Sequence, residues 1–93
     1  DEVFSFYKLE TIINKRKKQI KDDSYTNYLL NKGNKEIAKK IAEEANELAI
    51  SAVSNDGRIL EEAADLMYHL QVLLVANKLT LNNLEKVLSK RNK

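Results

Sequence analysis

The chain has 93 residues, of which 43% are hydrophobic and 32% are charged, and its formal net charge is +2. A chain of this length forms one domain, residues 1–93, which buries only somewhat more than ~60% of the surface that its unfolded form exposes. Cysteine is absent, which excludes disulfides and thiolate metal sites and makes association between subunits the expected source of extra stability. The sequence has no apolar run near the ~20 residues of a membrane span and no signal-peptide pattern, which predicts a cytoplasmic protein without membrane contact.

Apolar residues recur every three or four positions along the chain, which predicts helices throughout. The first helix is expected from Val3 to Ile20. Its apolar face holds Phe6, Leu9, Ile13 and Ile20. Asp22-Asp23-Ser24 should break this helix, and Ser24 is placed to cap a short helix that Gly33 ends.

The second long helix is expected to start at Asn34, a good N-cap, and to reach about Ser54. Its buried stripe is expected to comprise Ile37, Ile41, Ala45, Leu48 and Ala52. Asn55-Asp56-Gly57 is a compact turn signal, and a third long helix follows from about Arg58 to Ala76. This third helix is strongly apolar, so we expect it to be the most buried element.

Thr80 is expected to cap a last helix. Its apolar face holds Leu81, Leu84, Val87 and Leu88. Short connections between long helices imply antiparallel neighbours. The predicted fold is therefore all-α, an antiparallel bundle of about four main helices that homodimerisation completes, because one chain leaves apolar faces uncovered.

Acidic residues gather on the two central helices, as Glu43-Glu44-x-x-Glu47 and Glu62-x-x-Asp65. At about 100° per residue, Glu44 and Glu62 border the apolar faces of their helices, and Glu47 lies next to Glu44. If the two helices pack antiparallel through the tight turn, their acidic edges face each other. Clustered carboxylates repel one another unless a cation neutralises them, and an all-oxygen site suits Mg²⁺ or Mn²⁺. Such an ion holds phosphate oxygens, and a carboxylate that is not fully used as a ligand is placed to accept a proton from attacking water.

Most of the charged residues between positions 8 and 40, ahead of the acidic cluster, are basic, which fits a bound polyphosphate. The alternative explanation is structural, because the glutamates are also placed to pair with Lys39 and Lys40 one turn earlier. Exposed pairs of this kind contribute only ~0.3–0.5 kcal/mol each. His69 is the only histidine, and we expect it to form hydrogen bonds at the edge of the core rather than to bind metal.

The carboxylate pattern resembles the signature of the all-α nucleotide pyrophosphohydrolases, the MazG-like superfamily. Further elements, in the same order, are similar to the phosphoribosyl-ATP pyrophosphohydrolase family. They are Ile12-Ile13 with Arg16-Lys17, Ser24-Tyr25-Thr26, Leu29-Leu30, Gly33, Lys35-x-Ile37, Lys40-Ile41-Ala42-Glu43-Glu44-Ala45, Glu62-Ala63-Ala64-Asp65-Leu66-Met67-Tyr68-His69-Leu70 and Val72-Leu73-Leu74. The resemblance extends from about Leu9 to Arg91. Ala42 stands where the family often has glycine, and Asp22-Asp23 stand where proline is common, but neither departure touches the carboxylates.

The resemblance implies Mg²⁺-dependent hydrolysis of phosphoribosyl-ATP to phosphoribosyl-AMP and pyrophosphate, in histidine biosynthesis, by a homodimer. The implied metal ligands are Glu44, Glu47, Glu62 and Asp65. The implied catalytic carboxylates are Glu43, Glu44 and Glu47, of which Glu43 is an outer or second-ion ligand. The candidate contacts to phosphate and ribose are Arg16, Ser24, Thr26, Lys32, Lys35 and Lys40. Tyr25 and Tyr28 are expected in the core rather than stacked on a base.

Two other functions compete with this one. The nearer is another nucleotide pyrophosphohydrolase that clears dUTP or damaged nucleotides, against which the Ser24-Tyr25-Thr26 element argues. The other is a basic helical module that binds nucleic acid through Lys15-Arg16-Lys17-Lys18 and Lys90-Arg91-x-Lys93, or a pure interaction module. Both kinds of module leave the acidic cluster unexplained, so we expect a nucleotide substrate and no nucleic-acid partner.

Overall fold

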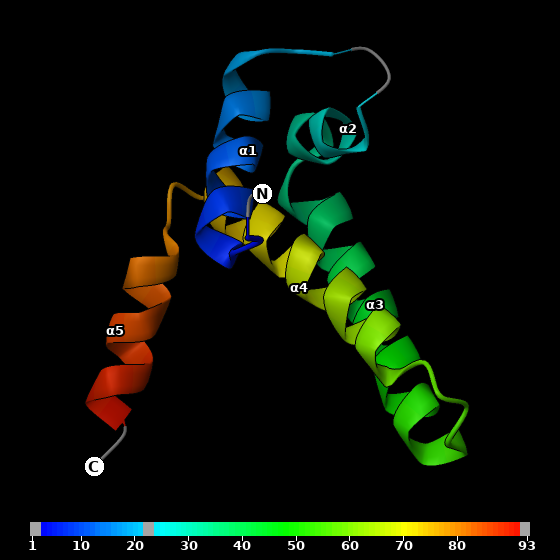
Figure 1. Cartoon of the computed structure of the whole chain (residues 1–93). Helices are drawn as coiled ribbons and strands as arrows, with labels where there is room; N and C mark the ends of the chain where they lie inside the picture. The colour runs from blue at the N-terminus through cyan, green and yellow to red at the C-terminus, as the bar shows by residue number, and fades with distance from the viewer. Residues whose placement is uncertain (1–2, 22–23, 92–93) are drawn as a thin grey trace.

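The computed structural model describes residues 3–21 and 24–91, so the predicted helix breaker Asp22-Asp23 and the C-terminal Lys93 lie outside the described residues. The described residues form five helices and no strand, which confirms the predicted all-α fold (Figure 1). The helices are α1 (Phe6–Lys18), α2 (Tyr25–Lys32), α3 (Asn34–Ser54), α4 (Ile59–Ala76) and α5 (Leu81–Arg91). Within these described segments, no helix is both long enough and apolar enough to cross a membrane.

Local hydrogen bonds fix the ends of the helices. Ser24 caps α2 as predicted, because its Oγ accepts a hydrogen bond from the backbone N–H of Asn27 at 3.2 Å. Thr80 caps the last helix as predicted, since its Oγ1 accepts a hydrogen bond from the backbone N–H of Asn83 at 3.0 Å. Gly33 ends α2 with a φ of +88°, a conformation that residues with a side chain rarely adopt.

The first two long helices differ from the prediction at their ends. Ser5 caps α1 by accepting a hydrogen bond from the backbone N–H of Lys8 at 3.1 Å, so residues 3–4 precede the helix. Ile20 lies beyond the end of α1 and is exposed, so it does not belong to the apolar face of this helix. Asn34 is the first residue of α3 rather than its N-cap.

Four helices contribute to one hydrophobic core. Its buried apolar side chains are Ile13, Leu29, Ile37, Val72 and Val75. Among the described helices, α4 has the most buried residues, four in all, which confirms the prediction that it is the most buried element. The core therefore lies where α1, α2 and the first half of α3 meet the second half of α4.

Toward its turn, the α3–α4 hairpin is less covered by the other helices. On the predicted buried stripe of α3, Ile37 is buried, and Ile41 and Leu48 are half-buried. Ala45 and Ala52 are exposed, so the prediction is wrong for these two positions in the single chain. The reason is that α4 is the main helix packed along this stretch of α3 (Figure 1).

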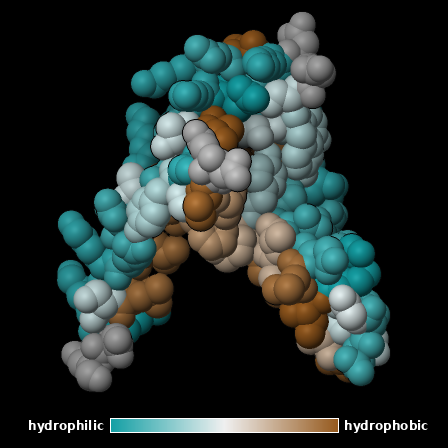
Figure 2. Space-filling view, viewed as in Figure 1, coloured by the Kyte–Doolittle hydropathy of each residue, from teal (hydrophilic) through white to brown (hydrophobic). Residues whose placement is uncertain are grey.

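The last helix, α5, lies apart from the α3–α4 hairpin, and Figure 1 shows the space between these two arms. Polar contacts attach α5 to α1: Glu10 Oε2 accepts a hydrogen bond from the backbone N–H of Leu81 at 2.8 Å, and the Tyr7 hydroxyl donates to Glu85. Leu81 is buried within the chain, so it does not belong to an uncovered apolar face. Figure 2 shows hydrophobic surface on both arms. The exposed large apolar side chains of α3, α4 and α5 are Ile50, Val53, Ile59, Leu60, Val87 and Leu88.

Candidate metal and nucleotide site

Three of the predicted metal ligands converge on the α3–α4 hairpin. Glu44 and Glu47 lie about one turn apart on α3, and Glu62 lies on α4. Each of these side chains contributes one carboxylate oxygen, and these three atoms lie within 4.8 Å of one another. The antiparallel packing through a short turn therefore brings the acidic edges of the two helices together.

The cluster is rich in negative charge, and Arg58 offsets part of it because its Nε lies 3.4 Å from Glu62 Oε2. The carboxylate of Glu44 raises the pKa of Glu47 above its ordinary value of 4.5, and burial, Glu62 and Asp65 raise this pKa further. Glu44 Oε1 and Glu62 Oε1 are buried, and in the part of the chain that the structure describes they have no hydrogen-bond partner. Buried acceptors are normally satisfied. Crowded carboxylate oxygens without partners are the donors that Mg²⁺ or Mn²⁺ prefers, so the residues present fit such an ion.

The other two predicted carboxylates lie at the margin of the cluster. Asp65 is exposed and outside the 4.8 Å group of the described residues, although its charge helps to raise the pKa of Glu47. Glu43 is also exposed, and its Oε1 lies 3.6 Å from the Nζ of Lys40. This ion pair is the kind that the structural alternative expected. The metal-ligand role of Asp65 and the catalytic role of Glu43 stay predictions.

His69 lies outside the carboxylate cluster and links two helices. It is buried, its Nδ1 lies 2.8 Å from the backbone carbonyl oxygen of Asp65, and its Nε2 lies 2.8 Å from the hydroxyl of Tyr25. A carbonyl oxygen only accepts hydrogen bonds, so Nδ1 donates to it and Nε2 is left as the acceptor for the Tyr25 hydroxyl. The prediction of a hydrogen-bonding histidine at the edge of the core is confirmed.

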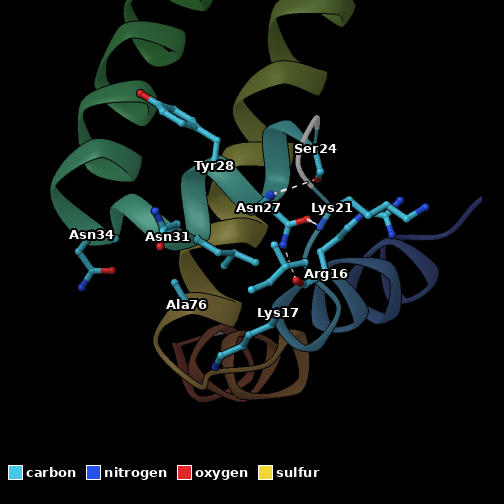
Figure 3. Close-up of a pocket in the computed structure, with 12 residues that line it drawn as sticks. Arg16, Lys17, Lys21, Ser24, Asn27, Tyr28, Asn31, Asn34 and Ala76 are labelled. Atoms are coloured by element: carbon cyan, nitrogen blue, oxygen red, sulfur yellow. Dashed lines mark hydrogen bonds between the residues drawn. The ribbon is translucent and has the colours of Figure 1, made fainter.

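A basic pocket with a volume of about 570 Å³ lies between the C-terminal end of α1, α2 and the neighbouring helix ends (Figure 3). Arg16, Lys17 and Lys21 bring positive charge to its wall. Lys17 Nζ also donates a hydrogen bond to the backbone carbonyl of Val75 at 3.2 Å. Two predicted substrate contacts, Arg16 and Ser24, line the pocket together, whereas Lys17 and Lys21 were not assigned to the site from the sequence.

The other predicted substrate contacts lie outside the lining of this pocket. Lys40 lies on α3, about one turn before the acidic cluster. The Thr26 hydroxyl shares a hydrogen bond with the hydroxyl of Tyr68. Lys32 and Lys35 are exposed, near the end of α2 and the start of α3. The structure therefore groups Arg16 with Ser24 and leaves the substrate roles of the other four residues as predictions.

Two aromatic residues of α2 lie outside the core, contrary to the prediction. Tyr25 and Tyr28 were expected in the core, but their side chains are 45% and 43% exposed. The buried position on this short helix belongs to Leu29, so the tyrosines lie on a different face. Their spacing of three residues on a helix was a signal that the two rings share one side of it.

Comparison with known proteins places the sequence in one family. The model of the phosphoribosyl-ATP pyrophosphohydrolase family matches residues 6–92. A protein of Listeria welshimeri serovar 6b, named phosphoribosyl-ATP pyrophosphatase, is 44% identical over 79 residues, which are 85% of this chain and 77% of that protein. A protein of the same name from Leptospira biflexa is 42% identical over 86 residues, 91% of this chain and 94% of that protein.

A third relative of that name comes from Pyrobaculum neutrophilum and is 44% identical over 85 residues, which are 90% of each chain. The family match spans both central helices, which carry the carboxylates of the candidate site. The chain therefore belongs to the phosphoribosyl-ATP pyrophosphohydrolase family.

Proposed function

We propose that this protein catalyses the Mg²⁺-dependent hydrolysis of phosphoribosyl-ATP to phosphoribosyl-AMP and pyrophosphate, a step of histidine biosynthesis in the cytoplasm. The observation that carries the proposal is the carboxylate cluster of Glu44, Glu47 and Glu62, whose oxygens lie within 4.8 Å of one another. The family supplies the identity of the substrate. The basic pocket on α1 and α2 provides positive charge for its phosphate groups.

The carboxylate cluster offers the donors that Mg²⁺ or Mn²⁺ requires. Glu44 and Glu62 each have a buried oxygen that lacks a hydrogen-bond partner among the described residues, and Glu47 offers a third oxygen nearby. Asp65 is proposed as the fourth ligand because its charge acts on the same cluster. The ion, when bound, supplies positive charge to the phosphate oxygens of the anhydride that is cleaved.

The same carboxylates supply a proton acceptor for the attacking water. Glu47 is the exposed member of the cluster, so a water molecule can reach its carboxylate. We therefore assign the general-base role to Glu47, with Glu44 beside it in the cluster. Glu43 is proposed as an outer carboxylate whose charge is balanced by Lys40, 3.6 Å away.

Positive and hydroxyl side chains are proposed to hold the phosphate and ribose groups. Arg16 and Ser24 contribute from the basic pocket, and Lys40 contributes from α3 beside the acidic cluster. The remaining proposed contacts are Thr26, Lys32 and Lys35.

A second copy of the chain is proposed as the partner that covers the exposed apolar side chains of α3, α4 and α5. Leu60 is 82% exposed on α4, and Leu88 is exposed on α5, so apolar surface remains on both arms. Burying such surface contributes about 25 cal/mol per Å². A small domain with a core of few buried residues gains stability from such an association.

An assay of released pyrophosphate tests the proposed activity. The purified protein is incubated with phosphoribosyl-ATP, ATP or dUTP, each with Mg²⁺ and with EDTA. We expect pyrophosphate from phosphoribosyl-ATP with Mg²⁺ and much less from the other two nucleotides. Faster hydrolysis of dUTP would contradict the assignment and favour a nucleotide-clearing enzyme, and equal activity in EDTA would contradict the role of the metal.

A further inference from the structure

Tyr25 and Tyr28 form an exposed aromatic surface on α2. Their ring centroids are 6.0 Å apart and the ring planes differ by 20°, so the rings are stacked and nearly parallel. The side chains are nevertheless 45% and 43% exposed. Ring surface that is ordered by stacking and still open to solvent is available to a ligand.

Contacts on the protein side hold the Tyr25 ring in place. It stacks with the ring of Tyr68 at 6.2 Å and 24°, and it meets the ring of His69 edge-on at 5.7 Å. The Tyr25 hydroxyl donates a hydrogen bond to His69 Nε2 at 2.8 Å. These contacts join α2 to α4, so the orientation of the ring is set before any ligand arrives.

The two hydroxyls are already in use, which limits what this surface offers to a ligand. The Tyr28 hydroxyl donates to Glu36 Oε2 at 3.1 Å, and that of Tyr25 donates to His69. The solvent-exposed part of the ring surface therefore remains for a ligand, and on Tyr28 this surface lies near Lys32, whose Nζ is 6.0 Å from the ring centroid. Such surfaces bind planar, apolar or π-electron-rich groups rather than phosphate or the hydroxyls of a sugar.

The tyrosine pair lies between the two charged regions of the site. The charges of Lys40 and Glu44 both act on the phenol of Tyr25, which shows that this ring lies beside the acidic side of α3. Tyr28 belongs to the lining of the basic pocket together with Arg16, and its ring extends from there toward α3 (Figure 3). The proposed substrate has a matching order of groups, since the purine of phosphoribosyl-ATP carries a ribosyl triphosphate on one side and a phosphoribosyl group on the other.

We propose that Tyr25 and Tyr28 form a platform on which the purine base of the nucleotide substrate stacks. The identity of that substrate rests on the proposed function, but the platform itself rests on the exposed, fixed rings. Base–aromatic stacking is tolerant of base identity because every base has a π-face. The platform therefore contributes affinity and orientation, and it places the base so that the phosphates extend toward the carboxylates.

The test compares Tyr28→Leu and Tyr25→Leu with Tyr7→Leu as a matched control. Tyr7 is also 43% exposed and its hydroxyl also donates to a glutamate, but it lies on α1 and contacts α5. Steady-state hydrolysis of phosphoribosyl-ATP gives KM and kcat. Binding of AMP without metal is followed by tyrosine fluorescence, since the chain has no tryptophan, and binding of ribose 5-phosphate, which lacks a base, is measured by calorimetry.

We expect both platform variants to raise KM and the Kd of AMP about ten-fold, to lower kcat by less, and to leave the Kd of ribose 5-phosphate unchanged. Tyr28→Phe keeps the ring and should recover most of the affinity that Tyr28→Leu loses. Tyr25 packs on two rings, so Tyr28→Leu carries the test if Tyr25→Leu does not fold. Unchanged KM and AMP affinity in Tyr28→Leu, or an equal loss in Tyr7→Leu, would overturn the platform.

The same measurements separate this inference from the proposed function. Tyrosine-dependent binding of AMP by a protein that does not hydrolyse phosphoribosyl-ATP would support the platform and overturn the activity. Normal hydrolysis of phosphoribosyl-ATP that does not depend on either tyrosine would support the activity and overturn the platform. If Tyr28→Leu weakened the binding of AMP and of ribose 5-phosphate equally, this would also count against stacking, because only AMP has a base.

Discussion

The carboxylates of Glu44 and Glu62 approach each other from two adjacent antiparallel helices, and each has one buried oxygen that lacks a hydrogen-bond partner within the described residues. Glu47 adds a third negative charge within the same 4.8 Å group. Packing α3 against α4 therefore brings like charges together in the metal-free protein. A cation that binds only the folded chain would remove this repulsion, which makes the stability of the protein depend on the metal.

Magnesium should stabilise the fold far more than an equivalent concentration of monovalent salt. A ligand that binds only the native state contributes ~2.7 kcal/mol at a hundredfold excess over its dissociation constant. We expect Mg²⁺ or Mn²⁺ at millimolar concentration to raise the melting temperature beyond the effect of sodium chloride at matched ionic strength. Glu62→Gln removes a ligand charge and should abolish most of this metal-specific rise, as measured by thermal unfolding.

The matched control for Glu62→Gln is Glu61→Gln, because Glu61 is the adjacent residue on α4, is exposed, and lies outside the carboxylate group. Its variant should retain the full response to Mg²⁺. Asp65→Asn should lose part of the Mg²⁺-specific rise in melting temperature, since Asp65 acts on the cluster from outside the 4.8 Å group. Identical melting shifts with magnesium and with matched sodium chloride in the unmodified protein would rule out a metal site here.

The raised pKa of Glu47 determines the sign of its contribution to the pH dependence of stability. In the unfolded chain Glu47 has its ordinary pKa of 4.5, whereas in the folded, metal-free protein the charge of Glu44 holds this pKa higher. Between these two values the folded state binds more protons than the unfolded state, so stability increases as the pH falls through this window. We expect Glu47→Gln to reduce this increase, as measured by urea unfolding at a series of pH values without metal.

Other groups also make the stability depend on pH, so the decisive quantity is the difference between the unmodified protein and Glu47→Gln. Asp56, for example, has a lowered pKa because Ser51 donates a hydrogen bond to it, and its contribution has the opposite sign. With saturating Mg²⁺ the increase in stability at lower pH that is attributed to Glu47 should disappear, because the ion neutralises the cluster. Parallel pH profiles for the two proteins would show that Glu47 does not experience the repulsion of its neighbours.

The positions of the helices and of the acidic cluster could be predicted because both depend on residues that are close together in the sequence. Ser24 and Thr80 act as caps through hydrogen bonds to residues three positions later, and such bonds depend only on the adjacent chain. Glu44 and Glu62 were placed at the edges of apolar faces by helical periodicity. The short turn between the helices then leaves few ways to pack them, so the convergence of the acidic edges also follows.

Tyr25, Tyr28 and Ala45 were misplaced because their burial depends on which other helix covers them. Periodicity shows which face of a helix is apolar, but it does not show whether a single chain supplies enough neighbours to cover that face. The basic pocket was found only in part for a related reason. Arg16 lies on α1 and Tyr28 lies on α2, and their presence in one pocket depends on how α2 folds back beside α1.

Glu47→Gln should reduce hydrolysis of phosphoribosyl-ATP strongly while the helical content remains unchanged. Changes to residues around a metal site typically cost 10–100-fold in activity, so removal of a proposed ligand and base should cost more than about a hundred-fold in kcat/KM. Glu61→Gln again serves as the control and should retain activity. A pyrophosphate assay combined with far-UV circular dichroism checks both parts, and turnover of Glu47→Gln near that of the unmodified protein would exclude Glu47 from the mechanism.

The proposed homodimer can be tested with two residues that have equal exposure but different locations. Leu60 on α4 and Ile20 beyond α1 are both 82% exposed in the single chain, so replacing either by asparagine should change the stability of the monomer little. Leu60 lies on the α3–α4 arm, where apolar surface is expected to meet a second copy. Ile20 instead lines the basic pocket.

Full burial of a leucine side chain contributes about 1.5–3 kcal/mol, and each ~1.4 kcal/mol changes a dissociation constant ten-fold. Leu60→Asn should therefore weaken dimerisation at least about ten-fold in sedimentation equilibrium, whereas Ile20→Asn should leave it unchanged. The unmodified protein should be dimeric at micromolar concentration. A stable monomer at that concentration would contradict the homodimer, and equal weakening by both variants would show that the α3–α4 arm is not its interface. If both variants weaken the dimer equally, the exposure of the apolar side chains on the α3–α4 arm is still unexplained. These side chains would then have to be covered by something other than the dimer contact.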